Sequence, residues 1–404
     1  MKEIFLRELA DIQTGPFGSQ LHKEDYVENG TPIVTVEHLG NKDFSEQNLP
    51  RVSNSDKERL KKYVLKEGDI VFSRVGSVDR CSYVDKTHAG WMFSGRCLRV
   101  RPNTEIDSEY LYYYFCMDEI KEFVRNIAVG ATMPSINTKL LGEVTVRFPD
   151  LVQQKKIAGV LSAIDGKIKV NQKINDNLQK QLYEIYKTWY QDFLCIDNLT
   201  LIESPYGKIP QGWHYSMLGD LCKSVSVTHN FNTERLIFLN TGDVEDGMFL
   251  HSDYMAVADM PGQAKKTIMQ NDILYSEIRP INRHFAYVDF QADNYVVSTK
   301  LMVIRATSFD SRRLYHFLTL QDTLEELQMQ AESRSGTFPQ IRFENISKLP
   351  ILIADSNTET AFVTLLHAAY NQIEHNNSEN KKLSELRNSL LPQLMSGKID
   401  VSRI

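Results

Sequence analysis

The sequence lacks the features of a secreted, disulfide-bonded or membrane protein. Only five of its 404 residues are cysteine, and none of them form the C-x-x-C spacing of a zinc or redox site. No apolar run approaches the roughly 20 residues that a membrane span needs, and the acidic residues close to Met1 do not fit a secretory signal. We therefore expect a cytoplasmic protein with reduced thiols and no membrane contact.

Net charge gives no clear direction. The chain carries 46 basic and 52 acidic residues, for a formal charge of −6 at pH 7. Many nucleic-acid-binding domains are basic, but phosphate contacts need a local positive surface and not a positive total. Charge alone therefore leaves DNA binding open.

The motifs of common enzymes are missing. The chain has no G-x-x-x-x-G-K-[ST] phosphate loop, no N-P-P-Y-type methyltransferase motif and no H-x-x-x-H metal spacing. Pro149-Asp150 and Asp165-Gly166-Lys167 imitate a short pattern of metal-dependent nucleases, but Asp165 and Lys167 stand beside the apolar positions of a helical segment. We predict a chain that has no active site, cofactor or metal of its own.

The sequence does contain one internal repeat. Four segments recur in the same order 203 to 209 residues later. They are Leu9–Ile12 with Leu218–Leu221, Lys66–Ser73 with Met269–Ser276, Asp107–Tyr112 with Asp310–Tyr315, and Thr132–Ile136 with Thr337–Ile341. Insertions and deletions in loops explain the small drift in offset. The pattern predicts two tandem copies of one unit.

The first part of each copy, residues 1–150 and 205–350, is predicted to be an α+β domain. Short alternating apolar runs bounded by Gly, Pro and Asp are typical of strands. The predicted strands include Asp69–Ser73, Leu98–Pro102, Asp272–Tyr275 and Leu301–Arg305, and the predicted helices are Tyr110–Val124 and Arg313–Met329.

The second part of each copy, residues 151–198 and 351–404, is predicted to contain one long helix. Between Leu161 and Trp189 the apolar and asparagine positions step by three and four residues, and all but one recur 205 residues later. Arg387 is the exception, unless Leu386 beside it turns inward. A stripe sustained over about four heptads predicts that the helices pair as an antiparallel coiled coil, with pseudo-two-fold symmetry.

Both stripes carry two asparagines. Polar residues in such a seam cost stability but fix register and partner choice, so an Asn-to-Asn match is attractive. The alternative is that these asparagines face solvent at a break in the stripe. The residues expected to pair are Ile168, Asn171, Asn175 and Leu178 with Ile373, Asn376, Asn380 and Leu383. A helix of this kind extends about 50 Å, the length of a spacer.

With these features the chain resembles the specificity (S) subunits of Type I restriction-modification systems. Ile209–Trp213 with Leu218–Leu221 resembles the opening of a target recognition domain in that family. The other similar stretches are the helix ends Tyr186–Phe193 and Leu390–Ile399 and the loop Gly130–Asn137. The first copy departs from the family because it lacks the Pro-x-Gly-Trp entry.

The resemblance implies how such a protein works. Each recognition domain would read one half of a bipartite site in double-stranded DNA, and the helices would set the gap between the halves. Two modification subunits, which bind S-adenosylmethionine, would dock on the chain. Restriction and motor subunits, which use ATP and Mg, would join through that core, and the chain itself would be non-catalytic.

Candidate DNA contacts are loop residues with basic or small polar side chains, together with one aromatic residue. In the first domain they are Thr14, Phe17, Ser19, Lys61, Lys62, Ser73, Arg74, Arg80 and Arg96. In the second domain they are Lys265, Lys266, Ser276, Arg279, Arg283, Arg334 and Ser335. Arg74 and Arg279 stand out because both follow the repeated strand at a similar distance. An ordinary solvated surface charge is the alternative for each.

Two rival functions stay open. The chain could be an assembly protein whose helices bind partners and whose domains read no DNA, or an enzyme with unrecognised motifs. The aromatic run Tyr112–Phe115 could be a platform for unstacked bases, although its helical spacing favours packing in a core.

Overall fold

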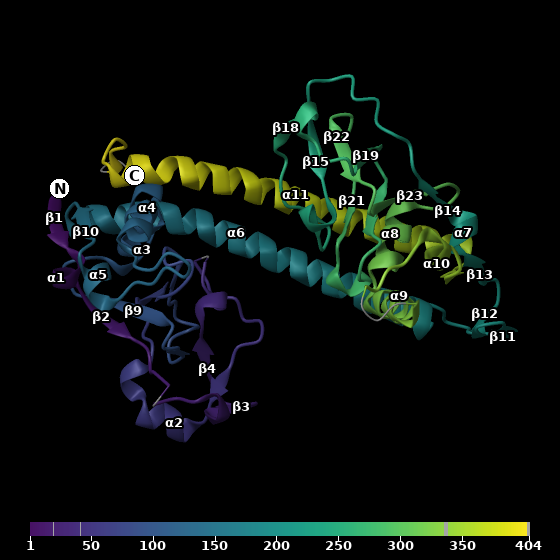
Figure 1. Cartoon of the computed structure of the whole chain (residues 1–404). Coiled ribbons are helices and arrows are strands. Elements are labelled where there is room, and N and C mark those ends of the chain that lie inside the picture. The colour runs from purple at the N-terminus through teal and green to yellow at the C-terminus, as the bar shows by residue number, and fades with distance from the viewer. Residues whose placement is uncertain (19, 41, 335–337, 402–404) are drawn as a thin grey trace. The chain divides into compact units, whose positions relative to one another are not determined.

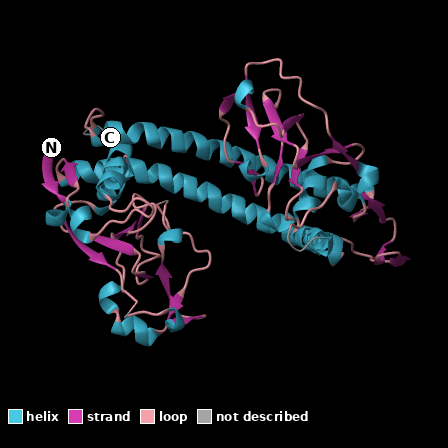
Figure 2. Ribbon diagram, in the orientation of Figure 1, coloured by secondary structure: helices cyan, strands magenta, loops and turns pink. Residues whose placement is uncertain are grey.

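The computed structural model describes residues 1–18, 20–40, 42–334 and 338–401. The chain divides into two compact units, Met1–Lys173 with Asn376–Ile404 (unit 1) and Ile174–His375 (unit 2). Strands and helices occur in both (Figures 1 and 2). The two long helices, α6 (Leu151–Tyr186) and α11 (Ser356–Met395), each contribute one part to each unit.

Unit 1 is built around short strands. They are β1 Lys2–Phe5, β2 Ala10–Thr14, β3 Tyr26–Val27, β4 Thr31–Val34, β5 Arg51–Val52, β6 Ile70–Ser73, β7 Cys81–Tyr83, β8 Met92–Phe93, β9 Cys97–Pro102 and β10 Thr145–Phe148. The helical elements are α1 Leu6–Leu9, η1 Lys23–Asp25, η2 Val36–His38, α2 Asn54–Arg59, η3 Lys61–Tyr63, α3 Ser108–Cys116, α4 Asp118–Ile127 and α5 Thr138–Gly142.

Unit 2 has the same style of construction. Its strands are β11 Leu201–Ser204, β12 Gly207–Pro210, β13 His214–Met217, β14 Cys222–Val225, β15 Arg235–Leu239, β16 Val244–Glu245, β17 Met248–Phe249, β18 Tyr254–Ala256, β19 Ala264–Thr267, β20 Ile273–Ser276, β21 Phe285–Tyr287, β22 Tyr295–Ser298, β23 Leu301–Ala306 and β24 Pro350–Ile353. Its helical elements are η4 Lys187–Gln191, α7 Leu218–Leu221, η5 Thr241–Asp243, η6 Val257–Asp259, η7 Pro280–Asn282, α8 Ser311–Thr319, α9 Gln321–Arg334 and α10 Phe343–Ser347.

The repeat in the sequence is a repeat in topology. An antiparallel sheet has the order β2-β9-β6-β7 in unit 1 and β14-β23-β20-β21 in unit 2. A second sheet has the order β3-β5-β4-β8 in unit 1 and β18-β15-β22-β19 in unit 2; each has one parallel pair, β4-β8 at the edge and β15-β22 in the middle, so the second sheets do not match strand for strand. The four predicted strands are therefore confirmed as β6, β9, β20 and β23, two in each copy.

The repeated Asp-Ile segment is explained by a buried ion pair. The carboxylate of Asp69 is almost fully buried and accepts two hydrogen bonds of 2.7 Å from Arg101 on β9. In unit 2 Asp272 accepts equivalent bonds of 2.6 and 2.8 Å from Arg305 on β23. A buried carboxylate must be paired with a cation or hydrogen-bond donors. The pairs Asp69–Arg101 and Asp272–Arg305 therefore recur because both copies need them for folding.

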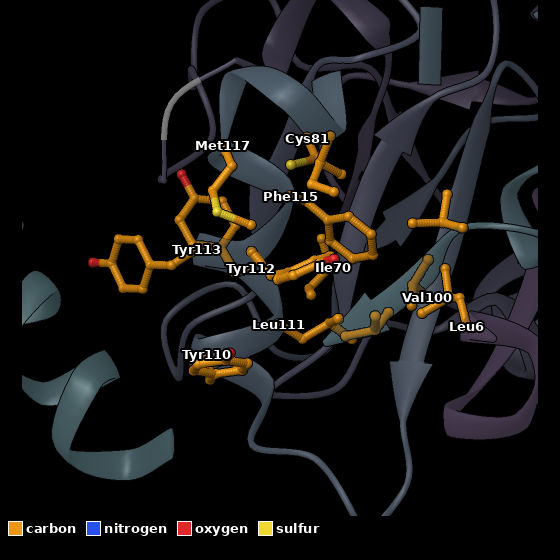
Figure 3. Packing of buried hydrophobic residues seen from close by; sticks show 14 of the residues in the cluster. Leu6, Ile70, Cys81, Val100, Tyr110, Leu111, Tyr112, Tyr113, Phe115 and Met117 are labelled. Carbon is orange, nitrogen blue, oxygen red and sulfur yellow. The ribbon is translucent and has the colours of Figure 1, made fainter. Parts of the chain in front are cut away.

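Helix α3 supplies much of the core of unit 1. Figure 3 shows Leu6, Ile70, Val100 and Phe115 packed together between this helix and the strands. Every side chain of Tyr112–Phe115 is at most 5% exposed. These aromatic rings are core residues, as the helical spacing favoured, and none of them is available to stack on bases.

Each helix predicted to follow the central sheet is in fact two helices. The stretch Tyr110–Val124 is interrupted at Met117, and Arg313–Met329 is interrupted at Leu320. Both interrupting residues have extended backbones and bury their side chains. An apolar side chain directed into the core thus outweighs helix continuity, and acidic residues in the next turn favour a new helix start.

In unit 1 the long helices contact each other through polar side chains. The Asn171 amide donates to Asn380 Oδ1 over 2.9 Å and to Glu379 Oε2 over 2.7 Å. Asn171 is fully buried and so does not face solvent. Arg387 donates to Asp165 over 2.7 Å. Because earlier residues of α6 meet later residues of α11, the two segments run antiparallel.

Arg387 itself occupies the irregular position of the stripe. Leu386 is 48% exposed, so it does not turn inward in place of Arg387. The reason is the acidic partner on α6, since Asp165 offers a half-buried guanidinium an ion pair that a leucine cannot use.

In unit 2 the long helices meet through aromatic residues. Tyr186 lies 6.1 Å from Phe362 between ring centres, and the Tyr190 hydroxyl donates to Glu359 over 2.7 Å. The same Glu359 accepts from the buried Arg313 over 3.0 Å.

Across the described residues, no helix is both long and apolar enough to span a membrane.

Candidate nucleic-acid interface

The turn that follows β6 presents an arginine beside an aromatic ring. Ser73 is buried and donates its hydroxyl to Val75 O over 2.8 Å, which shapes the turn. Arg74 donates to Gly95 O over 3.1 Å, and its guanidinium carbon lies 4.8 Å from the ring centre of Phe17. This geometry is a cation–π contact, which holds the guanidinium in one place.

The turn that carries Phe17 packs directly on the turn that carries Arg96. A Cβ on Gly15 would overlap the Ser94 carbonyl oxygen, and one on Gly95 would overlap the Pro16 carbonyl oxygen. Close backbone approach thus explains Gly15 and Gly95, whereas a Cβ on Gly18 would meet no atom within 4 Å.

Residues of both turns line a groove of about 860 Å³. Its lining includes the aromatic residues Phe17 and Tyr26, the basic residues Arg74 and Arg96, and the acidic residue Glu37. Arg96 is exposed, and its side chain forms no hydrogen bond or ion pair with the residues that the structure describes. Two cations against one acid make a surface suited to phosphate and to the acceptor atoms of bases.

Four other predicted contacts of the first domain do not line this groove. Thr14 ends β2, and Lys61 pairs with Glu58 over 3.3 Å. Lys62 lies 4.8 Å from the ring centre of its neighbouring tyrosine, and Arg80 donates to a backbone carbonyl. The structure therefore brings together Phe17, Arg74 and Arg96, but not these four residues.

The corresponding turn of unit 2 has the same backbone contacts but different charges. The Glu277 amide donates to Lys300 O over 3.1 Å, as that of Arg74 does to Arg96 O over 2.8 Å. The Arg279 amide donates to Pro339 O over 3.2 Å, as that of Gly76 does to Pro134 O over 2.9 Å. The expected equivalence of Arg74 and Arg279 is therefore wrong, because their distances from the repeated serine differ by two residues.

Three further predicted contacts of the second domain are already engaged. Ser276 is buried and donates to Ile278 O over 3.2 Å. Lys266 donates to two backbone carbonyl oxygens over 2.8 and 2.9 Å, and burial lowers the pKa of its ammonium group. Arg283 pairs with Asp246 over 2.6 Å. Ser276 and Lys266 stabilise the fold, as Ser73 does in unit 1. We therefore do not retain Ser73, Ser276 and Lys266 as DNA contacts.

The remaining candidates are placed less fully. Lys265 is exposed on β19. Ser19 and Ser335 lie outside the described residues. Arg334 is the last residue of α9, and its side chain also lies outside what is described.

Sequence reasoning missed part of the groove. Tyr26 of β3, Glu37 of η2 and Asn48 of a turn line it, and no local pattern predicts that these separate segments meet. Asn48 has a positive φ of 55°, which asparagine tolerates better than most residues. A search for polar residues in turns could have found Asn48 alone.

An acidic cluster joins the first domain to α6. Asp43, Asp85 and His88 bring their oxygen and nitrogen atoms within 4.8 Å of one another. The Lys169 ammonium lies 2.8 Å from Asp43 and 3.5 Å from Asp85 and already supplies positive charge there. Burial would raise the pKa of Asp85, but hydrogen bonds from Thr87 and His88 outweigh it and hold the pKa low. These ion pairs connect the first domain to α6.

Fold and site together define a duplicated α+β protein with one arginine-bearing turn in each copy. The model of the Type I restriction modification DNA specificity domain matches residues 1–180 and 210–385. The chain belongs to this family and carries the matched domain twice.

Individual proteins show the same relationship. The chain is 42% identical over 181 residues to the Type I restriction enzyme HindI specificity subunit of Haemophilus influenzae, a match that covers 44% of this chain and 39% of that protein. It is 25% identical to the MjaIX specificity subunit of Methanocaldococcus jannaschii, over 75% of this chain and 72% of the relative. The crystal structure of a Type-I restriction-modification system S subunit from M. genitalium shares the fold, with a TM-score of 0.59, 16% identity, and coverage of 97% of this chain and 95% of that one.

Proposed function

We propose that the chain is the DNA sequence-specificity subunit of a Type I restriction-modification complex and recognises a bipartite site, one half through each copy. The observation that carries this proposal is the contrast between the two turns. The backbone contacts of Arg74 and Glu277 are alike, yet the side chains differ in charge. A shared frame with different contact residues is what reading two different half-sites requires.

The proposed division of the chain follows the repeat. Residues 1–150 and 205–350 are the two target recognition domains, and residues 151–198 and 351–404 are the conserved spacer helices. We propose that the helices pair as an antiparallel coiled coil with pseudo-two-fold symmetry and set the gap between half-sites. The contact of Asn171 with Asn380 supports this pairing, because polar seam residues fix register.

The proposed partners supply the chemistry. Two modification subunits bind S-adenosylmethionine and methylate adenine, and restriction and motor subunits join through that core with ATP and Mg. The chain itself acts as a non-catalytic subunit in the cytoplasm. Asp165, which belonged to the nuclease-like pattern, supports a structural role, since Arg387 and the Tyr113 hydroxyl both donate to it.

The test is a genome-wide methylation map. The full chain is expressed with its modification subunit in a host without DNA methylation. We expect one split motif, two short half-sites around a fixed gap, methylated at adenine. A stable complex that leaves no methylated motif would favour the assembly-protein alternative and overturn DNA reading.

The spacer role has its own test. Seven residues of matching heptad pattern are inserted after Lys173 in α6 and after His375 in α11, which keeps the stripe in phase. Each helix lengthens by about 10 Å, or roughly three base pairs of DNA at 3.4 Å each. We expect a gap longer by that amount with both half-sites unchanged, whereas an unchanged gap would contradict the spacer proposal.

A further inference from the structure

The turn after β20 holds an arginine in an unfavourable backbone conformation. Arg279 has φ 43° and ψ 79°, in the left-handed region. A residue with a Cβ is strained there, because the Cβ approaches the neighbouring carbonyl oxygen. The following residue is Pro280, which restricts its predecessor further.

The first copy shows that this backbone position accepts glycine. Gly76 has φ 75° and donates from its amide to Pro134, as Arg279 does to Pro339. The fold alone would thus be served by glycine at position 279. Strained residues of this kind persist where the surroundings hold them, and they cluster at sites that bind ligands.

The Arg279 side chain has no structural task among the described residues. It is exposed, and no hydrogen bond, ion pair or ring contact connects its guanidinium to any of them. Arg283, which ends the same turn and also has a positive φ, is different. Its guanidinium pairs with Asp246 and lies 5.3 Å from the ring centre of Phe285.

The neighbouring charges leave Arg279 as the available cation of this turn. In unit 1, Arg74 and Arg96 stand at adjacent backbone positions and both line the groove. At the equivalent positions of unit 2, Lys300 lies 3.6 Å from the Glu277 carboxylate, so the two charges compensate each other. The second copy therefore presents positive charge two residues further along the chain.

We infer that Arg279 determines specificity for the second half-site by donating its paired N–H groups to the O6 and N7 atoms of a guanine. This inference rests on the proposed function and adds the residue and the base. The planar guanidinium matches the two acceptors that guanine presents in the major groove, whereas a lysine ammonium donates as a point charge. The first half-site is read without an arginine at this position, since Gly76 stands there.

The experiment uses the full chain with its modification subunit and three variants. Arg279→Gly removes both the side chain and the backbone strain. Arg279→Asn removes the guanidinium and introduces a residue that adopts the left-handed conformation readily, and Arg279→Lys keeps the positive charge. Lys348→Ala removes one exposed charge from the same unit as a control. Binding is measured on the mapped site and on duplexes in which single base pairs of either half are exchanged.

Arg279→Gly and Arg279→Asn are expected to bind the mapped site roughly tenfold to a hundredfold more weakly. Both should stop discriminating at one G·C pair of the second half-site and keep full discrimination in the first. Arg279→Lys should retain more affinity than either but lose the same discrimination. The Gly variant should be as heat-stable as the wild-type chain, and Lys348→Ala should change neither readout.

Two results would overturn the inference. One is unchanged discrimination at every position of the second half-site in folded Gly or Asn variants. The other is uniform weakening on all duplexes with a salt dependence lower by about one unit, which identifies a phosphate contact. Failure of the proposed function is distinct, because the wild-type complex itself would then show no preference for a split site.

Discussion

Arg387 of α11 donates to Asp165 of α6 over 2.7 Å at a position where the heptad stripe calls for an apolar residue. The other carboxylate oxygen accepts from the Tyr113 hydroxyl over 2.6 Å. Asp165 is only 11% exposed, whereas Arg387 is 32% exposed. One carboxylate thus connects both long helices with the core helix α3 in unit 1.

Replacing Arg387 with leucine should destabilise unit 1 by about 2 kcal/mol, because a largely buried carboxylate loses its cation while solvent still screens part of the site. The double variant Arg387→Leu with Asp165→Asn should recover most of this loss, since the amide oxygen can still accept from Tyr113. Urea unfolding of the single and double variants measures both effects. Additive losses in the double variant would show that the pair is not coupled.

The strand frame was predictable from the sequence because its signals are local. The runs ending at Ser73 and Ser276 are short and apolar and stop at turn residues, and the buried partners of Asp69 and Asp272 recur with them. The long helices were predictable for the same reason, since a heptad stripe is a property of neighbouring turns.

The site was predictable only in part, because it depends on how loops meet. The sequence pointed to Phe17, Arg74 and Arg96, but not to Tyr26 or Glu37, which line the same groove. Arg74 and Arg279 share their charge but not their backbone position, because the backbone contacts of Arg279 correspond to those of Gly76. The helix breaks at Met117 and Leu320 arise from tertiary burial, which helical spacing does not report.

The repeated buried ion pairs should act independently. Arg101→Ala leaves the buried Asp69 without its cation and should cost roughly 3 kcal/mol. Hydrogen exchange should then speed up in β6 and β9, while β20 and β23 keep their protection. Arg305→Ala should give the reverse pattern. Loss of protection in both units from one substitution would contradict independence.

His316 should make unit 2 sensitive to acid. Burial and the nearby Arg313 lower the pKa of its imidazole to about 3, against about 6.5 in an unfolded chain. Tyr370 and Tyr186 also face the ring. Below about pH 6.5 the unfolded chain therefore binds a proton that the folded chain does not bind. The free energy of unfolding decreases as the pH is lowered through this range.

The matched variant is His316→Gln, which is neutral at every pH and can still accept from the Tyr370 hydroxyl. Between pH 7 and pH 5 the wild-type chain should lose about 2 kcal/mol of unfolding free energy that the variant keeps. His214→Gln, on the exposed side of β13, serves as the control and should leave the pH dependence unchanged. Parallel pH profiles for the wild-type chain and His316→Gln would refute this account.

Phe17 should contribute to the first half-site by holding Arg74 in place. A partly exposed cation–π contact is worth about 0.5–1 kcal/mol, so Phe17→Leu should weaken binding to the mapped site roughly twofold to fivefold. Phe17→Trp keeps a ring under the guanidinium and should restore most of the affinity. Binding of each variant complex to duplexes with an altered first or second half-site locates the effect.

Phe5 offers a matched control for this substitution. Its ring also lies under a guanidinium, that of Arg7 at 4.2 Å, in the same unit but outside the groove. Phe5→Leu removes an equivalent contact and should leave DNA binding unchanged. If Phe5→Leu weakens binding as much as Phe17→Leu does, the loss reflects general destabilisation of unit 1, and Phe17 has no particular role in holding Arg74 for the DNA.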